Sequence, residues 1–135
     1  VTAVPAAGGL AAVAAGAARQ ALGHAEGGRV AVIAPAARVD EVAAAVGVVP
    51  AAGAGSAVLE QPIAVYPVEG AKGLEFDAVV VVEPAELVDE RRNGLRALYV
   101  ALTRTTRTLH LVHHRPLPAP IGGVENDRLG VNGVP

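Results

Sequence analysis

The sequence predicts an α/β domain in three layers: a mostly parallel β-sheet with helices on both faces. Short apolar runs alternate with alanine-rich or amphipathic segments along the 135 residues, an alternation typical of parallel sheets. Two of the apolar runs, in residues 30–35 and 77–83, are continuous, which indicates strands buried on both faces. Glycine or proline follows most of the segments and marks where each one ends.

The first half of the chain predicts a helix, a strand and a second helix. Residues 9–22 are rich in alanine and favour a helix that ends at Gly23. Residues 30–35 form an apolar run that Pro35 stops, as expected of a buried parallel strand. In residues 38–47 the valines recur at helical spacing up to Gly47, so this segment predicts a helix that leads to the next strand.

The second half predicts three further strand regions and one helix. Two short extended pieces are followed by the strongest strand of the chain, which contains four consecutive valines and ends at Pro84. A helix then begins between Asp89 and Asn93, either of which can cap it, and runs to about Thr105. The predicted extended segments are residues 57–59, 63–68, 77–83 and 108–114. We expect one domain over residues 1–115 and a mobile tail, rich in proline and glycine, over residues 116–135.

Composition excludes several classes of function. The formal net charge of −2 makes the isolated chain a poor nucleic-acid binder by bulk electrostatics. The absence of cysteine and of a long apolar run predicts a cytoplasmic protein that does not enter a membrane. His110, His113 and His114 alternate between the two sides of a strand, so we expect no metal site.

The only lysine of the chain, Lys72, lies in "AKGLEF" before the valine run. Gly73 could bring the backbone close to a ligand or adopt a positive φ, and Lys72 could meet a phosphate, although a simple turn would use the same residues. No G-x-x-x-x-G-K-[ST] motif occurs, so the chain has no P-loop of its own. We interpret Asp77 as structural, because no acid-base partner stands near it.

In "LRALYVALTRTTR", four apolar residues follow helical spacing and predict a stripe that faces the core: Leu95, Leu98, Tyr99 and Leu102. Arg104 falls on the opposite side at about 100° per residue, so its guanidinium is predicted to reach outward from the helix end. An exposed arginine favoured by the helix dipole is the alternative interpretation.

Together, "GAKGLEFDAVVVV" and "LRALYVALTRT" resemble motifs V and VI of superfamily 1 helicases of the UvrD/Rep type, in that family's order and at its short spacing. The resemblance covers roughly residues 63–115 and implies the second RecA-like domain of such a protein. The P-loop then belongs to a partner domain of the same parent protein. That partner domain would hold most of the cofactor, ATP with Mg²⁺.

The resemblance also implies roles for individual residues. Arg104 matches the arginine finger that reaches the γ-phosphate of ATP, a catalytic role. Glu75 matches the carboxylate that contacts the ribose, and Gly73 matches the glycine whose backbone lies near the γ-phosphate. Lys72 and Arg96 match motif positions and are expected to have supporting roles.

One departure from the motif bears on the target of the motor. DNA-tracking members carry Thr-x-His before the Lys-Gly pair, where this chain has Pro67 and Glu69. Because Glu69 would repel phosphate, the sequence looks more like the HelD branch, whose helicase-like ATPase engages RNA polymerase. A conventional UvrD-like helicase that translocates on single-stranded DNA is the alternative, and a non-catalytic interaction module is another.

Overall fold

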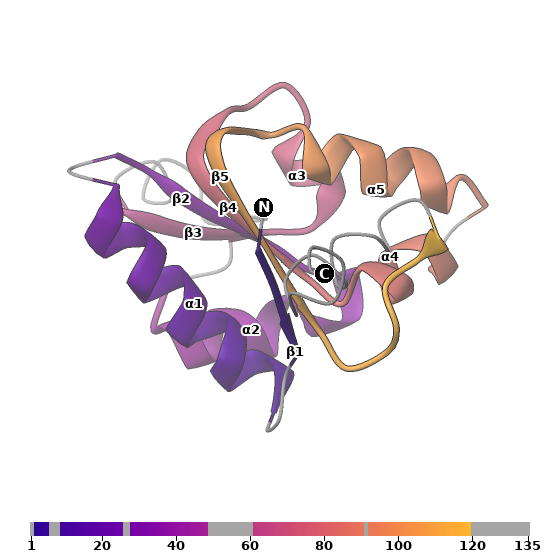
Figure 1. Ribbon diagram of the computed structural model, residues 1–135, viewed down its shortest axis with the longest axis horizontal. Coiled ribbons are helices and arrows are strands. Elements are labelled where there is room, and N and C mark those ends of the chain that lie inside the picture. Colours follow the sequence, from indigo (N-terminus) through magenta and orange to yellow (C-terminus); the bar gives the residue numbers. More distant parts are fainter. Residues whose placement is uncertain (1, 6–8, 26–27, 49–60, 91, 120–135) are drawn as a thin grey trace, which may run out of the picture.

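The computed structural model describes residues 2–5, 9–25, 28–48, 61–90 and 92–119. Its centre is a five-stranded sheet with the strand order β1-β5-β4-β2-β3, in which all pairs are parallel (Figure 1). The strands are β1 (Thr2–Pro5), β2 (Val30–Ile33), β3 (Ile63–Tyr66), β4 (Phe76–Val82) and β5 (Thr105–His113). The predicted parallel sheet is thus confirmed, and β1 is a strand that the sequence analysis did not predict.

Helices cover both faces of the sheet and complete the three predicted layers (Figure 1). One face carries α1 (Leu10–His24) and α2 (Val39–Val46), which is preceded by the 3-10 turn η1 (Ala36–Arg38). The other face carries α3 (Val68–Ala71), α4 (Pro84–Asp89) and α5 (Gly94–Leu102). No helix in the described part of the chain is long and apolar enough to cross a membrane.

The valine run of β4 forms the middle of both core layers. Val79 and Val81 pack with α3, α4 and α5, whereas Val80 and Val82 pack with α1 and α2. This division follows from the geometry of a strand, in which successive side chains point to opposite faces. A continuous apolar run is therefore required here, because each face of the strand is buried against helices.

Several predicted boundaries agree with the structure and others shift. Gly47 ends α2 in the left-handed conformation at φ 91°, as expected of a helix-terminating glycine. The first helix continues past Gly23 and ends at His24. The last strand begins at Thr105, earlier than predicted, so the preceding helix ends at Leu102 and not at about Thr105.

Two prolines begin helices where the sequence analysis expected extended chain or a strand end. Pro67 occupies the N-cap of α3, so the predicted strand over 63–68 ends at Tyr66. Pro84 does end β4, but it also begins α4, which was not predicted. Proline suits a first helical turn because its missing N–H would have no intrahelical partner there.

The predicted apolar stripe of α5 is wrong for two of its members. Leu95 and Tyr99 have exposed fractions of 57% and 67%, whereas Leu98 is buried. The buried residues of α5 are Gly94, Ala97, Leu98 and Ala101, and all of them except Leu98 are small. Small side chains let the helix lie close to its neighbours, and hydrophobicity alone did not reveal that preference.

Two predictions concern segments that lie wholly or partly outside the described residues. The extended piece at 57–59 falls entirely outside them. Of the segment 116–135, only residues 116–119 are described. Within that stretch, Leu117 is buried in the core cluster formed with α3, α4 and α5.

Close packing between α4 and α5 makes Gly94 sensitive to substitution. A Cβ atom at Gly94 would collide with the backbone of Val88, and a backbone cannot move aside as a flexible side chain can. Gly94→Ala should therefore lower the free energy of unfolding by about 3 kcal/mol, as measured by urea denaturation. Gly16→Ala in α1 is the matched control, because its Cβ would meet nothing within 4 Å. The control should raise stability by up to about 1 kcal/mol, and equal effects of the two changes would contradict the packing described.

Candidate functional site at the amino edge of the sheet

The two motif segments meet where β4 and β5 begin. The backbone N–H of Phe76, the first residue of β4, donates to the carbonyl oxygen of Arg104 at 2.9 Å. Arg104 directly precedes β5, so this bond joins the amino ends of two adjacent parallel strands. The loop before β4 and the turn after α5 are therefore held side by side, although Phe76 and Arg104 are far apart in sequence.

The side chain of Arg104 points back over this junction. Its Nε donates to the carbonyl oxygen of Val100 at 3.1 Å, and one terminal nitrogen lies 3.5 Å from the carbonyl oxygen of Leu74. The other terminal nitrogen lies 3.2 Å from the hydroxyl of Thr103. The guanidinium is thus partly buried and already hydrogen-bonded, so the prediction that it extends freely outward is wrong for this conformation.

Gly73 and Glu75 flank Leu74, the loop residue whose carbonyl oxygen lies 3.5 Å from the guanidinium of Arg104. Gly73 has φ +79°, a conformation that residues with a Cβ rarely adopt, which confirms one of the two uses predicted for it. Glu75 is exposed and makes no hydrogen bond or ion pair with any described residue. The loop therefore offers an exposed carboxylate one residue away from the carbonyl group that the arginine contacts.

Lys72 turns away from this group of residues. Its ammonium nitrogen lies 3.3 Å from a carboxylate oxygen of Glu69, one turn earlier, and both side chains are more than half exposed. Both residues line a groove between α3 and α5. The structure thus joins the loop that contains Gly73 and Glu75 to Arg104, while the lysine ammonium group pairs with Glu69.

Asp77 has the structural role that we predicted. Its carboxylate accepts a hydrogen bond from the backbone N–H of Arg29 at 2.8 Å and so ties the start of β2 to β4. Gly28 lets the carboxylate approach, since a Cβ at this position would collide with Asp77. The strand begins at Phe76, so Glu75 and Asp77 do not share a strand face.

Arg29 is a residue at this edge that the sequence analysis missed. Its guanidinium carbon lies 5.0 Å from the centre of the Phe76 ring, within the range of a cation–π interaction. Two of its guanidinium nitrogens are buried without a hydrogen-bond partner among the described residues. A lone arginine before a strand gives no sequence signal for such an arrangement.

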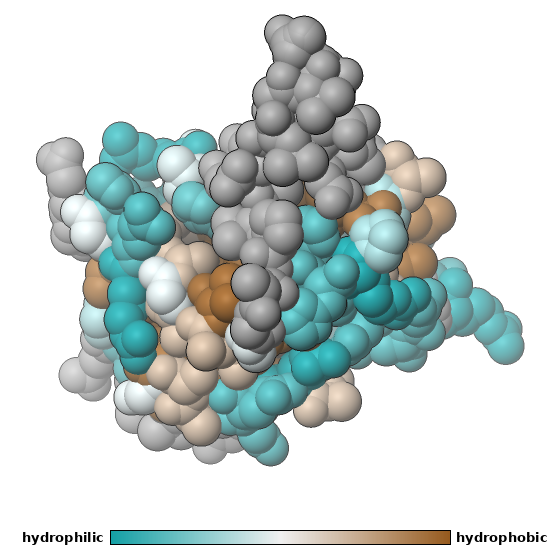
Figure 2. Space-filling model, turned by 60° about the horizontal axis from the view of Figure 1, so that its bottom comes forward, coloured by the Kyte–Doolittle hydropathy of each residue, from teal (hydrophilic) through white to brown (hydrophobic). Residues whose placement is uncertain are grey.

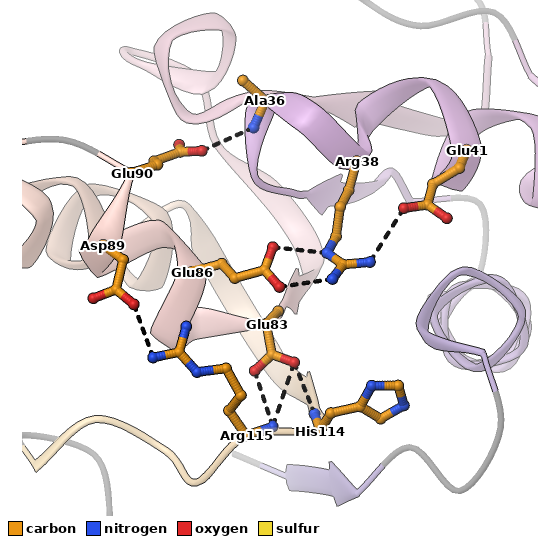
Figure 3. Close-up of polar contacts among 9 residues, drawn as sticks. All are labelled: Ala36, Arg38, Glu41, Glu83, Glu86, Asp89, Glu90, His114 and Arg115. Atoms are coloured by element: carbon orange, nitrogen blue, oxygen red, sulfur yellow. Dashed lines mark hydrogen bonds and ion pairs between the residues drawn. The ribbon is translucent and has the colours of Figure 1, made fainter.

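The opposite, carboxyl edge carries a polar network and none of Gly73, Glu75 or Arg104. Glu83 follows β4 there, is 1% exposed, and adopts φ 47°. Its carboxylate accepts hydrogen bonds from the backbone N–H groups of His114 and Arg115 (Figure 3). Glu83 therefore ties the end of β4 to the chain that follows β5.

Ion pairs surround Glu83 at this edge (Figure 3). Arg38 donates two hydrogen bonds to Glu86, both 2.7 Å long, and a third to Glu41 at 3.2 Å. Arg115 pairs with Asp89 at 2.8 Å. The hydrogen bonds from Arg38 hold the pKa of Glu86 below its ordinary value.

Hydrophilic residues cover much of the face shown in Figure 2, with apolar residues between them.

The histidines are separated as strand alternation predicts, but one of them is more buried than expected. His113 is 3% exposed, and its Nδ1 lies 2.9 Å from the carbonyl oxygen of Arg115. His110 is half-buried beside α1, and burial lowers its pKa. Within the described ranges, no group of three or more potential ligands is placed to hold a metal ion.

The fold indicates the class of protein. A parallel sheet covered on both faces by helices is the architecture of an α/β RecA-like domain. A solved structure supports this class: the C-terminal domain of a possible DNA helicase from Lactobacillus plantarum WCFS1. It aligns with a TM-score of 0.63 and 25% sequence identity, covering 91% of this chain and 78% of that chain.

The family comparison is more specific. Residues 62–112 match the UvrD-like helicase C-terminal domain, and the matched segment includes Gly73, Glu75 and Arg104. Over this segment the chain is therefore similar to the C-terminal domain of UvrD-like helicases. No curated protein sequence matches the chain.

The pair of Arg38 and Glu86 should make stability depend on pH. Because the folded-state pKa of Glu86 is lowered, its contribution is present above the ordinary value of 4.5 and is lost as the pH falls through the folded-state pKa. Glu86→Gln should therefore destabilise the chain by about 1 kcal/mol at neutral pH and by less under acid conditions. Urea denaturation at both pH values measures the difference. A loss of equal size at both would show that the ion pair is not its source.

Proposed function

We propose that this domain is one half of an ATP-driven motor and that it supplies Arg104 to ATP held by a P-loop domain of the same parent protein. The observation that carries the proposal is the approach of the Arg104 guanidinium to the carbonyl oxygen of Leu74, between Gly73 and Glu75. This contact unites the two segments that resemble helicase motifs. The sequence itself contains no P-loop motif, so a nucleotide would need a second domain to hold its phosphates.

Arg104 is suited to such a role because its present partners can be exchanged. All three are neutral oxygens, from the carbonyls of Val100 and Leu74 and the hydroxyl of Thr103. Hydrogen bonds from a guanidinium to a phosphate are charge-assisted and are roughly twice as strong as bonds between neutral groups. An approaching γ-phosphate would therefore compete well for the guanidinium. Placed there, the positive charge would stabilise the transition state of phosphoryl transfer.

Glu75 and Gly73 complete the proposed nucleotide contact. The exposed carboxylate of Glu75 is free to accept hydrogen bonds from ribose hydroxyl groups, since it has no partner among the described residues. The positive φ of Gly73 shapes the loop, and the lack of a side chain leaves its backbone accessible. Mg²⁺ would be held mainly by the P-loop domain, and the isolated chain is expected to hydrolyse no ATP.

The target of the motor has two candidates. The resemblance to the HelD branch supports RNA polymerase. The similar structure from Lactobacillus plantarum WCFS1 bears the description of a possible DNA helicase, which favours single-stranded DNA. The acidic Glu69 was the main argument against DNA as the target of the motor. Its pairing with Lys72 reduces the repulsion that this carboxylate would exert on a phosphate group.

The finger role predicts a selective loss of turnover. In the intact parent protein, Arg104→Ala should lower kcat for ATP hydrolysis by roughly 10³- to 10⁵-fold, with little change in ATP affinity. Steady-state kinetics and nucleotide titration measure the two effects separately. Arg107→Ala is the matched control, because Arg107 is an exposed arginine on the face of the sheet that carries α1. Full activity of Arg104→Ala would instead favour a non-catalytic interaction module.

The two targets predict different activators. The ATPase rate of the parent protein should be measured alone, with single-stranded DNA and with RNA polymerase. Stimulation by DNA would establish the translocase and reject the HelD-like assignment. Indifference to DNA, with a response to polymerase, would mean that Pro67 and Glu69 mark a motor that acts on a protein complex.

A further inference from the structure

Arg29, the residue that precedes β2, carries a charged group that is partly buried without the usual hydrogen bonds. Two nitrogens of its guanidinium, Nε and one terminal nitrogen, are buried and have no hydrogen-bond partner among the described residues. A charged donor that loses its water without gaining an acceptor raises the free energy of the folded state. A group of this kind in a native protein calls for an explanation beyond stability.

The guanidinium of Arg29 lies against the only phenylalanine of the chain, Phe76. The guanidinium carbon is 5.0 Å from the centre of the ring, and the negative face of an aromatic ring attracts a cation at such a distance. This attraction is stronger when both groups are shielded from water, and Phe76 is 2% exposed. The ring of Tyr66 packs against the same ring, with the two ring centres 5.5 Å apart. A cation and a second aromatic ring therefore both restrict the position of the Phe76 ring.

Arg29 also holds the residue after Phe76, through its backbone. The N–H of Arg29 donates to the carboxylate of Asp77 at 2.8 Å, and its carbonyl oxygen accepts a hydrogen bond from the N–H of Asp77 at 3.0 Å. Gly28 is required for this arrangement, because a Cβ at that position would collide with the Asp77 carboxylate. The side chain and the backbone of Arg29 thus contact two successive residues at the start of β4.

Phe76 in turn is bonded to the candidate site. β4 lies between β2 and β5 in the sheet, so Arg29 approaches Phe76 from one neighbouring strand and Arg104 approaches it from the other. The N–H of Phe76 donates to the carbonyl oxygen of Arg104 at 2.9 Å, and the carbonyl oxygen of Phe76 accepts from the hydroxyl of Thr106 at 3.2 Å. A displacement of Phe76 would therefore displace the backbone of Arg104. An error of about 1 Å in the placement of a catalytic group can reduce turnover by roughly 10²-fold.

We infer that Arg29 is a positioning residue for Arg104. Its guanidinium holds the ring of Phe76, and Phe76 holds the backbone from which the Arg104 side chain extends. In this role Arg29 acts through Phe76 and does not contact the nucleotide. The inference rests on the proposed function, because it concerns the group that would reach the γ-phosphate. It adds the amino end of β2 to a site that is otherwise formed by the two motif segments.

The test compares ATP hydrolysis by variants of the intact parent protein. Arg29→Ala should lower kcat by about tenfold to hundredfold and change the Kd of ATP by less than about twofold, because the P-loop domain would hold most of the nucleotide. Arg19→Ala is the matched control. The guanidinium of Arg19 donates to the carbonyl oxygens of Ala45 and Val46 and joins α1 to α2, so its loss should affect stability and leave kcat unchanged. Urea denaturation and circular dichroism verify that each variant is folded under the conditions of the assay.

A double-mutant cycle tests whether Arg29 acts through Arg104. In the Arg104→Ala background, with residual turnover followed under single-turnover conditions, Arg29→Ala should change the rate by less than about twofold, since no guanidinium remains to be positioned. A purely structural role would give the same fold-loss in both backgrounds. Phe76→Leu keeps an apolar side chain but removes the aromatic face, so it should lower kcat as Arg29→Ala does. It provides the same test if Arg29→Ala does not fold.

The inference and the proposed function fail in different ways. Unchanged kcat in Arg29→Ala, a loss shared by Arg19→Ala, or equal losses in the two backgrounds would overturn the inference. So would a loss of ATP affinity as large as the loss of kcat, because Arg29 would then contact the nucleotide directly. These outcomes leave the arginine-finger role intact as long as Arg104→Ala loses its turnover. Full activity of Arg104→Ala would instead overturn that role, and the inference with it.

Discussion

The pairing of β4 with β5 is the constraint on which the rest of the structure depends. β4 lies at the centre of the sheet, and its valines supply core to both layers of helices. Once β4 and β5 are parallel neighbours, their amino ends must lie at the same edge of the sheet. The bond from the N–H of Phe76 to the carbonyl of Arg104 fixes that junction. The contact between the guanidinium of Arg104 and the carbonyl oxygen of Leu74 lies at this junction.

The charged groups at the two edges of the sheet differ in their partners. At the carboxyl edge, Arg38 pairs with Glu86, and the carboxylate of Glu83 accepts hydrogen bonds from backbone N–H groups that follow β5. At the amino edge, Arg104 is bonded only to neutral oxygens and Glu75 has no partner among the described residues. Paired charges hold a structure together, whereas unpaired ones remain able to meet a ligand. This contrast favours the amino edge as the functional one.

Much of the fold could be predicted because its signals are local. The valine run, the glycine that ends α2 and the alternation of strand and helix each follow from residues close together in sequence. The orientation of α5 could not be predicted in this way. Its buried face uses Gly94 and Ala97, whose value lies in close packing, while the more hydrophobic Leu95 and Tyr99 stay exposed. Sequence hydrophobicity measures the tendency of a residue to be buried and carries no information on how closely a neighbouring backbone approaches.

For the candidate site, the sequence proposed residues but did not predict their conformations. Gly73, Glu75 and Arg104 were singled out by resemblance, and the structure brings their segments together. The inward turn of Arg104 depends on the carbonyl of Leu74, distant in sequence, and the pairing of Lys72 with Glu69 depends on α3, a helix that was not predicted. Arg29 was missed because its contact with Phe76 exists only in the folded sheet.

The most direct test of the central claim is a structure of the intact parent protein bound to ADP and aluminium fluoride, which mimics the transferring phosphoryl group. The account predicts that the guanidinium of Arg104 leaves the carbonyl oxygens of Val100 and Leu74 and donates to the fluoride atoms. A structure in which the fluoride site is occupied while Arg104 keeps both carbonyl bonds would contradict it.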